Sequence, residues 1–216
     1  MTKSNNPLDE YMKNAKSTKE KLMINAIILF SKKGYNNVGI RSICSGVGIK
    51  ESSFYNHYKG KEALFEEIIK YFVESGKRVI FTEDEINTSI EQGDVGYFFK
   101  TNMEKFALHT GNPLIHMILQ LITMESYTNE LAFNISKHHI YYSRKDYTEK
   151  VLCGLQKKGT IIDCDIKQVT SEYYYGLKGL LDEYLLYTAW DKDINGIMDK
   201  IKNHITFYTD LLRKEP

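Results

Sequence analysis

Apolar residues recur at helical spacing along most of this 216-residue chain. The first clear segment is preceded by Ser17 and Glu20, which have the spacing of a capping box, and is followed by Gly34, a residue able to end a helix in the left-handed conformation. These positions predict a helix over about residues 17–34. Its apolar stripe is made of Leu22, Ala26, Ile27, Leu29 and Phe30.

The same spacing predicts helices through the rest of the chain, so the expected fold is all-α. Two short helices, over about 40–46 and 50–57, follow the first one and are too short to be stable alone. We expect them to share a core with the first helix through Ile40, Ile43, Val47, Ile49 and Phe54. Longer helices are expected over about 61–81, 94–109, 113–126, 128–158, 166–188 and 194–213.

Charge divides the chain unevenly. Residues 1–62 hold 11 Lys and Arg against 5 Asp and Glu, whereas the remaining residues hold 18 against 23. A polyanionic partner would therefore meet the N-terminal end. We expect a flexible arm over 1–16, a small helical domain over 17–62 and a larger helical domain over 63–216, joined by the helix over 61–81.

The segment 38–61 has the pattern of a helix-turn-helix, with a glycine-containing turn and hydroxyl, aromatic and basic side chains on the second helix. It resembles the helix-turn-helix of the TetR family of bacterial transcriptional regulators from about residue 18 to 65. One departure is Gly39, where the family usually has a Thr or Ser that caps the helix. The matching residues are Gly34-Tyr35, Ile40-Arg41-x-Ile43, Val47-Gly48-Ile49 and Phe54-Tyr55-x-His57-Tyr58-Lys59-x-Lys61-Glu62-x-Leu64.

The resemblance implies contacts that position the protein on DNA and contacts that select the sequence. Tyr55, Lys59 and Lys61 are the expected phosphate ligands, with Lys61 at a helix start that favours anions. Arg41 is expected to reach a base or a phosphate, and His57 either touches a phosphate or packs on the first helix. The expected sequence-reading residues are Lys50, Glu51, Ser52, Ser53 and Asn56.

One short recognition helix covers few base pairs, so this mode of reading implies a homodimer on two half-sites. The last two predicted helices carry apolar stripes that would form a four-helix bundle with a second copy, or would face the core of their own chain. The interface residues predicted from the stripes are Leu177, Leu181, Tyr184, Ile201, Ile205 and Tyr208.

The resemblance also implies an effector pocket in the C-terminal domain. The chain has 16 tyrosines, which would suit an aromatic or largely apolar small molecule, although aromatic stripes also fill ordinary cores. The candidate pocket residues are Phe72, Phe106, His109, His116, Glu125, Tyr127, Tyr141 and Tyr174.

The sequence as a whole favours a homodimeric, DNA-binding transcriptional repressor that a small effector releases from its operator. The alternative is a TetR-like, nucleoid-associated protein that binds chromosomal sites and a protein partner. The chain has no nucleophile elbow, phosphate loop, HExxH or Cys/His ligand set, so we expect neither an enzyme nor a cofactor or metal. Three cysteines without ligand spacing and no long apolar run favour a cytoplasmic bacterial protein with no membrane partner.

Overall fold

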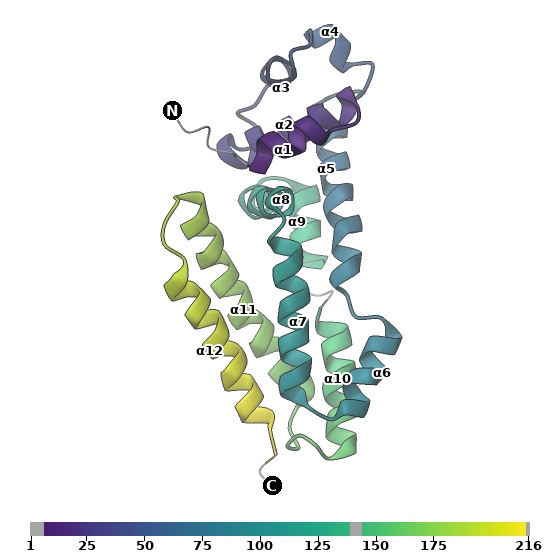
Figure 1. The fold of residues 1–216 in the computed structure, drawn as a ribbon, viewed down its shortest axis with the longest axis vertical. Coiled ribbons are helices and arrows are strands. Elements are labelled where there is room, and N and C mark those ends of the chain that lie inside the picture. Colours follow the sequence, from purple (N-terminus) through teal and green to yellow (C-terminus); the bar gives the residue numbers. More distant parts are fainter. Residues whose placement is uncertain (1–6, 139–143, 215–216) are drawn as a thin grey trace. The chain divides into compact units, whose positions relative to one another are not determined.

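The computed structural model describes residues 7–138 and 144–214, and these residues are almost entirely helical, which confirms the all-α prediction (Figure 1). The chain divides into two compact units. The first comprises residues 1–77 and 108–136, and the second comprises residues 78–107 and 137–216. Within the described part, the only bridge between extended segments is an isolated antiparallel pair, Ile161 with Arg213.

The first unit is organised around helix α2, which packs against α1, α3, α5 and α8. Its core includes Phe30, Ile43, Phe54, Leu64 and Ile118, which are buried. Ring contacts between helices, such as Phe30 with Phe65 at 6.4 Å between centroids, add to this core. The helices are α1 (Pro7–Asn14), α2 (Thr18–Lys33), α3 (Ile40–Val47), α4 (Glu51–Phe54), α5 (Lys61–Gly76), α8 (Pro113–Glu125) and α9 (Glu130–Ile135).

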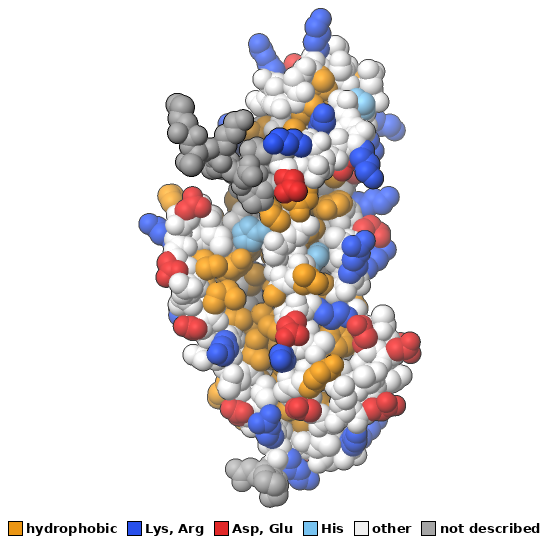
Figure 2. Space-filling view, viewed as in Figure 1, with side chains coloured by type: hydrophobic (Ala, Val, Ile, Leu, Met, Phe, Trp, Pro, Cys, Tyr) orange, Lys and Arg blue, Asp and Glu red, His pale blue; other side chains and the backbone are white. Residues whose placement is uncertain are grey.

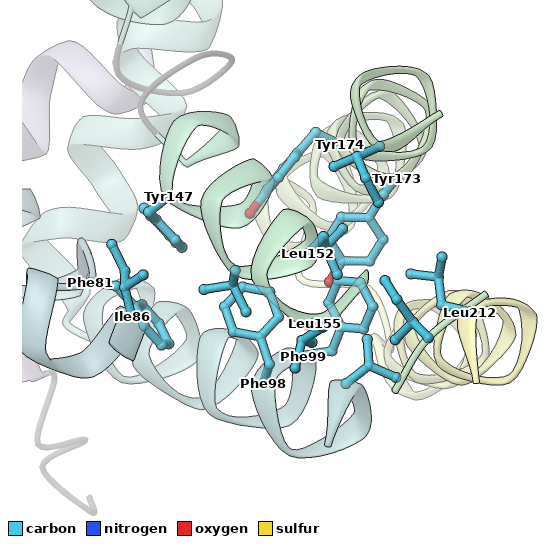
Figure 3. Close-up of a cluster of buried hydrophobic side chains, with 14 residues drawn as sticks. Phe81, Ile86, Phe98, Phe99, Tyr147, Leu152, Leu155, Tyr173, Tyr174 and Leu212 are labelled. Carbon is cyan, nitrogen blue, oxygen red and sulfur yellow. The ribbon is translucent and has the colours of Figure 1, made fainter. Parts of the chain in front are cut away.

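The second unit is built from α6 (Glu83–Gln92), most of α7 (Val95–Thr110), α10 (Lys145–Lys158), α11 (Ile166–Ala189) and α12 (Asn195–Leu212). Helix α10 packs on α6 and α11, and α11 packs on α12. Aromatic side chains from several helices meet in its core, where Phe81 stacks on Tyr147 and Phe99 lies 4.6 Å from Tyr173 between ring centroids (Figure 3). Burial of these side chains is the main contribution to the stability of this unit.

Some helix boundaries differ from the prediction. The segment predicted as an arm over 1–16 contains α1, whose Tyr11 and Met12 are half-buried as the helix packs on α2 and α8. The helix predicted over 61–81 ends at Gly76, and a 3-10 turn over Lys77–Val79 follows. Helix α6 was not predicted; Thr82 and Glu85 start it with a complete capping box. The single helix predicted over 128–158 is divided into α9 and α10.

None of the helices in the described ranges is long and apolar enough to cross a membrane.

Candidate nucleic-acid interface

Helix α3 ends in a sharp turn that leads directly into α4. Gly48 takes the left-handed conformation at φ 76°, and its N–H and that of Ile49 bond the last carbonyls of α3, the second to Cys44 O at 3.1 Å. Helix α4 proper covers Glu51–Phe54, and tighter turn bonds continue it to Tyr58, including His57 N to Phe54 O at 2.9 Å. The helix predicted over 50–57 is therefore a short α-helix extended by turns.

Two aromatic residues fix this second helix to the rest of the domain. Phe54 is fully buried, and Tyr58 is buried with its hydroxyl donating to the carbonyl of Lys19 at 3.2 Å. Burial raises the pKa of the Tyr58 hydroxyl, so it remains a donor at neutral pH. Of the side chains between these two anchors, those of Tyr55 and Asn56 are exposed.

Most of the residues predicted to contact DNA lie on the surface of this unit. Ser53 and His57 are half-buried, and Tyr55 is more than half exposed. On the face shown in Figure 2, Lys and Arg side chains project from the end of the unit that carries α3 and α4. The exposed polar residues among the predicted set are Arg41, Lys50, Glu51, Ser52, Asn56 and Lys59.

Lys61, predicted as a phosphate ligand, makes intramolecular bonds. Its ammonium donates to the carbonyls of Tyr35 at 2.9 Å and Val38 at 3.1 Å, and lies 4.2 Å from the centre of the Tyr35 ring. These carbonyls lie in the loop between α2 and α3, where no helical N–H is available to them. Lys61 therefore holds the loop that leads into α3, and only one of its three N–H groups is left for a phosphate.

The same loop is held from the other side by a buried carboxylate. Glu125 at the end of α8 accepts a hydrogen bond from the backbone N–H of Tyr35 at 2.8 Å. Thr128 Oγ1 lies 3.5 Å from the second carboxylate oxygen. Glu125 was predicted to line an effector pocket, but its carboxylate is engaged with the start of the helix-turn-helix.

Close contact between α2 and α3 depends on Gly46, whose role the sequence analysis missed. A Cβ atom at this position would lie 2.3 Å from Asn25 Nδ2, far inside contact distance. The Asn25 amide also donates to the carbonyl of Ile43 at 2.8 Å, which ties α2 to α3. A glycine inside a helical apolar pattern was the available signal.

Gly39 begins α3 without a side-chain cap, as the sequence predicted. Its φ of −91° and ψ of 158° are normal for a capping Ser or Thr, and no described atom lies within 4 Å of a Cβ built there. The helix start therefore has space for the missing hydroxyl.

The candidate pocket residues are distributed over both units. In the first, Phe72 lies 6.0 Å from the His109 ring, and Ser75 Oγ is 2.9 Å from His109 Nε2; His116 is half-buried. Tyr127, on the turn after α8, is 92% exposed. In the second unit, Phe106 and Tyr174 contact Arg144, and Tyr141 lies outside the described residues.

Part of each apolar stripe on α11 and α12, which was predicted to form a dimer interface, packs against the core of its own unit. Leu177, Ile205 and Tyr208 pack against that core, and Leu181, Tyr184 and Ile201 are half-buried. Both helices carry a further apolar set on the surface, which the predicted stripe did not include, because helical spacing alone does not identify the outer face. This surface set comprises Tyr175, Leu186 and Tyr187 on α11, Trp190 directly after it, and Met198, Phe207 and Leu211 on α12.

Comparison with known proteins supports the family resemblance. Residues 23–68 match the family described as "Bacterial regulatory proteins, tetR family". A 52-residue stretch is 40% identical to the biofilm operon icaADBC HTH-type negative transcriptional regulator IcaR of Staphylococcus aureus strain Newman, and covers 24% of this chain and 28% of that protein. The matched region is thus about a quarter of each chain.

Solved structures extend the similarity to the fold of almost the whole chain. The repressor SmeT of the Stenotrophomonas maltophilia multidrug efflux pump SmeDEF aligns over 93% of this chain and 92% of its own, with a TM-score of 0.64 and 14% identity. A transcriptional regulator from Rhodococcus sp. Rha1 aligns over 93% and 100%, with a TM-score of 0.62 and 11% identity. At these identities the likeness establishes the fold alone.

Proposed function

We propose that this chain, whose N-terminal domain is that of TetR-family transcriptional regulators, is a repressor that binds its operator as a homodimer and is released by a small effector. The observation that carries the proposal is the exposed polar surface on and beside α4, held in place by the buried anchors Phe54 and Tyr58. We propose no catalytic activity for this chain.

The DNA-binding role is supported by the chemistry of this surface. Lys50 and Arg41 can donate to guanine or phosphate oxygens, and Asn56 can pair with adenine. Lys59 and Tyr55 lie beyond α4 and suit the phosphate backbone. The N-terminal excess of Lys and Arg adds a sequence-independent attraction to DNA.

Dimerisation through α11 and α12 is supported by the surface set of apolar residues on both helices. On the face shown in Figure 2, hydrophobic side chains gather over these two helices. Trp190 is 71% exposed and Phe207 61%, which is costly for a monomer in water. Two helices from each copy would cover both sets in a four-helix bundle.

Operator selection from random DNA, followed by footprinting, tests the proposal. We expect a two-fold symmetric site whose half-site centres lie about 34–36 Å apart, or a multiple of one helical turn, on one face of the duplex. Transcription from a promoter that contains the site should fall when the protein is added. Equal affinity for selected and random DNA at fixed salt would contradict the proposed function.

A further inference from the structure

A charged side chain is buried in the second unit at the meeting point of α7, α10 and α11. Arg144 retains 9% of its surface. Its Nε donates to the Tyr147 hydroxyl at 3.3 Å, and its Nη2 donates to Asn102 O at 3.3 Å and to Asn102 Oδ1. Tyr147 and Tyr174, its neighbours, belong to the apolar core of this unit (Figure 3).

This guanidinium has no anionic partner among the described residues. Its hydrogen bonds go to an amide side chain, a backbone carbonyl and a hydroxyl. The ring of Phe106 lies 4.4 Å from Cζ and that of Tyr174 lies 5.7 Å away, so cation–π attraction offsets part of the desolvation. A buried cation normally needs a counter-ion as well.

The hydrogen-bond network around Arg144 is neutral and already occupied. Tyr147 OH donates to Asn102 Oδ1 at 3.0 Å, Asn102 Nδ2 donates to Tyr174 OH at 3.1 Å, and Tyr174 OH lies 2.8 Å from Thr148 Oγ1. These bonds fix the orientation of Asn102 and, through it, of the guanidinium. Nη1 makes no hydrogen bond within the described part of the chain.

The position of Arg144 at a helix start also favours an anion here. Arg144 is the N-cap of α10, a 14-residue helix, and makes no side-chain capping bond, so the positive end of the helix dipole begins at this residue. Asp146, the acidic residue of the first turn, is exposed.

We propose that Arg144 binds the carboxylate of a small organic acid whose apolar or aromatic body packs on the neighbouring rings. Nη1 supplies the donor that no group of the described chain uses, and the bound carboxylate supplies the missing counter-charge. The effector of the proposed repressor is then an acid with an apolar body. This link to DNA release rests on the proposed function; the binding site itself does not.

The test compares acids with uncharged molecules of the same shape. Binding of decanoate and 2-naphthoate to the full-length protein is measured by titration calorimetry without DNA, beside 1-decanol and 2-naphthalenemethanol. We expect at least one acid to bind at least about tenfold more tightly than its alcohol, since a charge-assisted hydrogen bond is lost in the alcohol. Failure of both acids to bind, or equal binding of acids and alcohols, overturns the proposal.

Two variants place the effect at this site, and a third controls for net charge. Arg144→Gln removes the cation, and Asn102→Asp supplies an internal carboxylate to it. Both should weaken binding of the acid at least about tenfold, while Asn102→Asp also raises the melting temperature. Arg78→Gln removes an exposed arginine of the same unit and should leave the affinity unchanged.

Asn102→Asp decides the question where Arg144→Gln does not fold. In the proposed site, the internal carboxylate of Asn102→Asp and the carboxylate of the acid compete for the same guanidinium. Undiminished acid binding by Asn102→Asp therefore overturns the proposal, and so does an equal loss of binding in Arg78→Gln. Operator binding by the wild-type protein is measured separately. Acid binding without specific DNA binding would leave this site standing and remove the proposed function, and the reverse outcome would remove this site alone.

Discussion

The backbone amide of Tyr35 donates to the buried carboxylate of Glu125, 90 positions further along the chain, at 2.8 Å. Through this bond α8 holds the loop that precedes α3. Glu125→Ala should lower the free energy of unfolding by about 1–3 kcal/mol, because it leaves a buried N–H unsatisfied. Chemical denaturation checks this, with the exposed Glu130→Ala on α9 as the control. An effect equal to that of the control would show that water replaces the carboxylate at no cost.

Lys61 and Lys59 should respond differently to truncation. Lys59 is exposed, so Lys59→Ala should lower the slope of log affinity against log salt by about one and leave stability unchanged. Lys61→Ala should destabilise the protein by about 1–2 kcal/mol, because the carbonyl of Val38 loses its donor and that of Tyr35 keeps only the long bond from the N–H of Val38 at 3.4 Å. DNA titrations at several salt concentrations and thermal denaturation separate the two roles. A reduced slope with unchanged stability in Lys61→Ala would make it a plain phosphate ligand.

A serine at position 39 should improve the start of α3. Gly39→Ser should add a few tenths of a kcal/mol to stability, since the hydroxyl caps a free N–H and has room to do so. The same hydroxyl should tighten DNA binding if this helix start approaches a phosphate. Gly48→Ser is the matched control: at φ 76° a side chain is strained, and stability should fall by about 1 kcal/mol. Melting curves of both variants with and without DNA make the comparison.

The exposed apolar set predicts which substitutions separate the subunits. Trp190→Glu should give folded monomers in light scattering, because its side chain is 71% exposed in the single chain. Ile205→Glu should instead unfold the second unit, since Ile205 packs on its core. Leu108→Glu, at an exposed position of the first unit, should remain a dimer. A dimeric Trp190→Glu protein would place the interface on another surface.

His116 should make the protein less stable in mild acid. Burial lowers the pKa of His116 below the ordinary value of histidine, so the unfolded chain binds this proton more readily than the folded one. The contribution of His116 is therefore present above pH 6.5 and is lost as pH falls towards its folded pKa. Denaturation midpoints between pH 7.5 and pH 5 should fall less in His116→Gln than in the wild type, with His57→Gln as control. Parallel curves would exclude His116 as the cause.

Local signals in the sequence predicted much of the first unit. Gly34, Gly48 and the capping residue Ser17 end or start helices because each acts on backbone groups a few residues away. Even there the detail differs: Ser17 accepts from the amide of Glu20, but the Glu20 carboxylate accepts from Lys16 and not from the N-cap. A one-residue shift of this kind depends on how the chain enters the helix.

The roles of residues that act over long distances in the chain could not be predicted from the sequence, because their partners are main-chain atoms or lie on distant helices. Nothing in the neighbourhood of Glu125 or Lys61 indicates that each binds the loop around Tyr35. Likewise, Arg144 follows a tyrosine-rich segment and reads as an ordinary surface charge. Its burial depends on α7 and α11, which are brought to it only by the fold.

Asn25 and Gly46 show how closely α2 and α3 are fitted together. Because a single added carbon at position 46 would collide with the amide of Asn25, neither residue can be exchanged freely on its own. A side chain at 46 forces the Asn25 amide to move, and the moved amide gives up its bond to the carbonyl of Ile43. Substitutions at the two positions are therefore coupled. Selection for folded protein from a library randomised at position 46 alone should return glycine, and new recognition helices are best designed with both positions varied together.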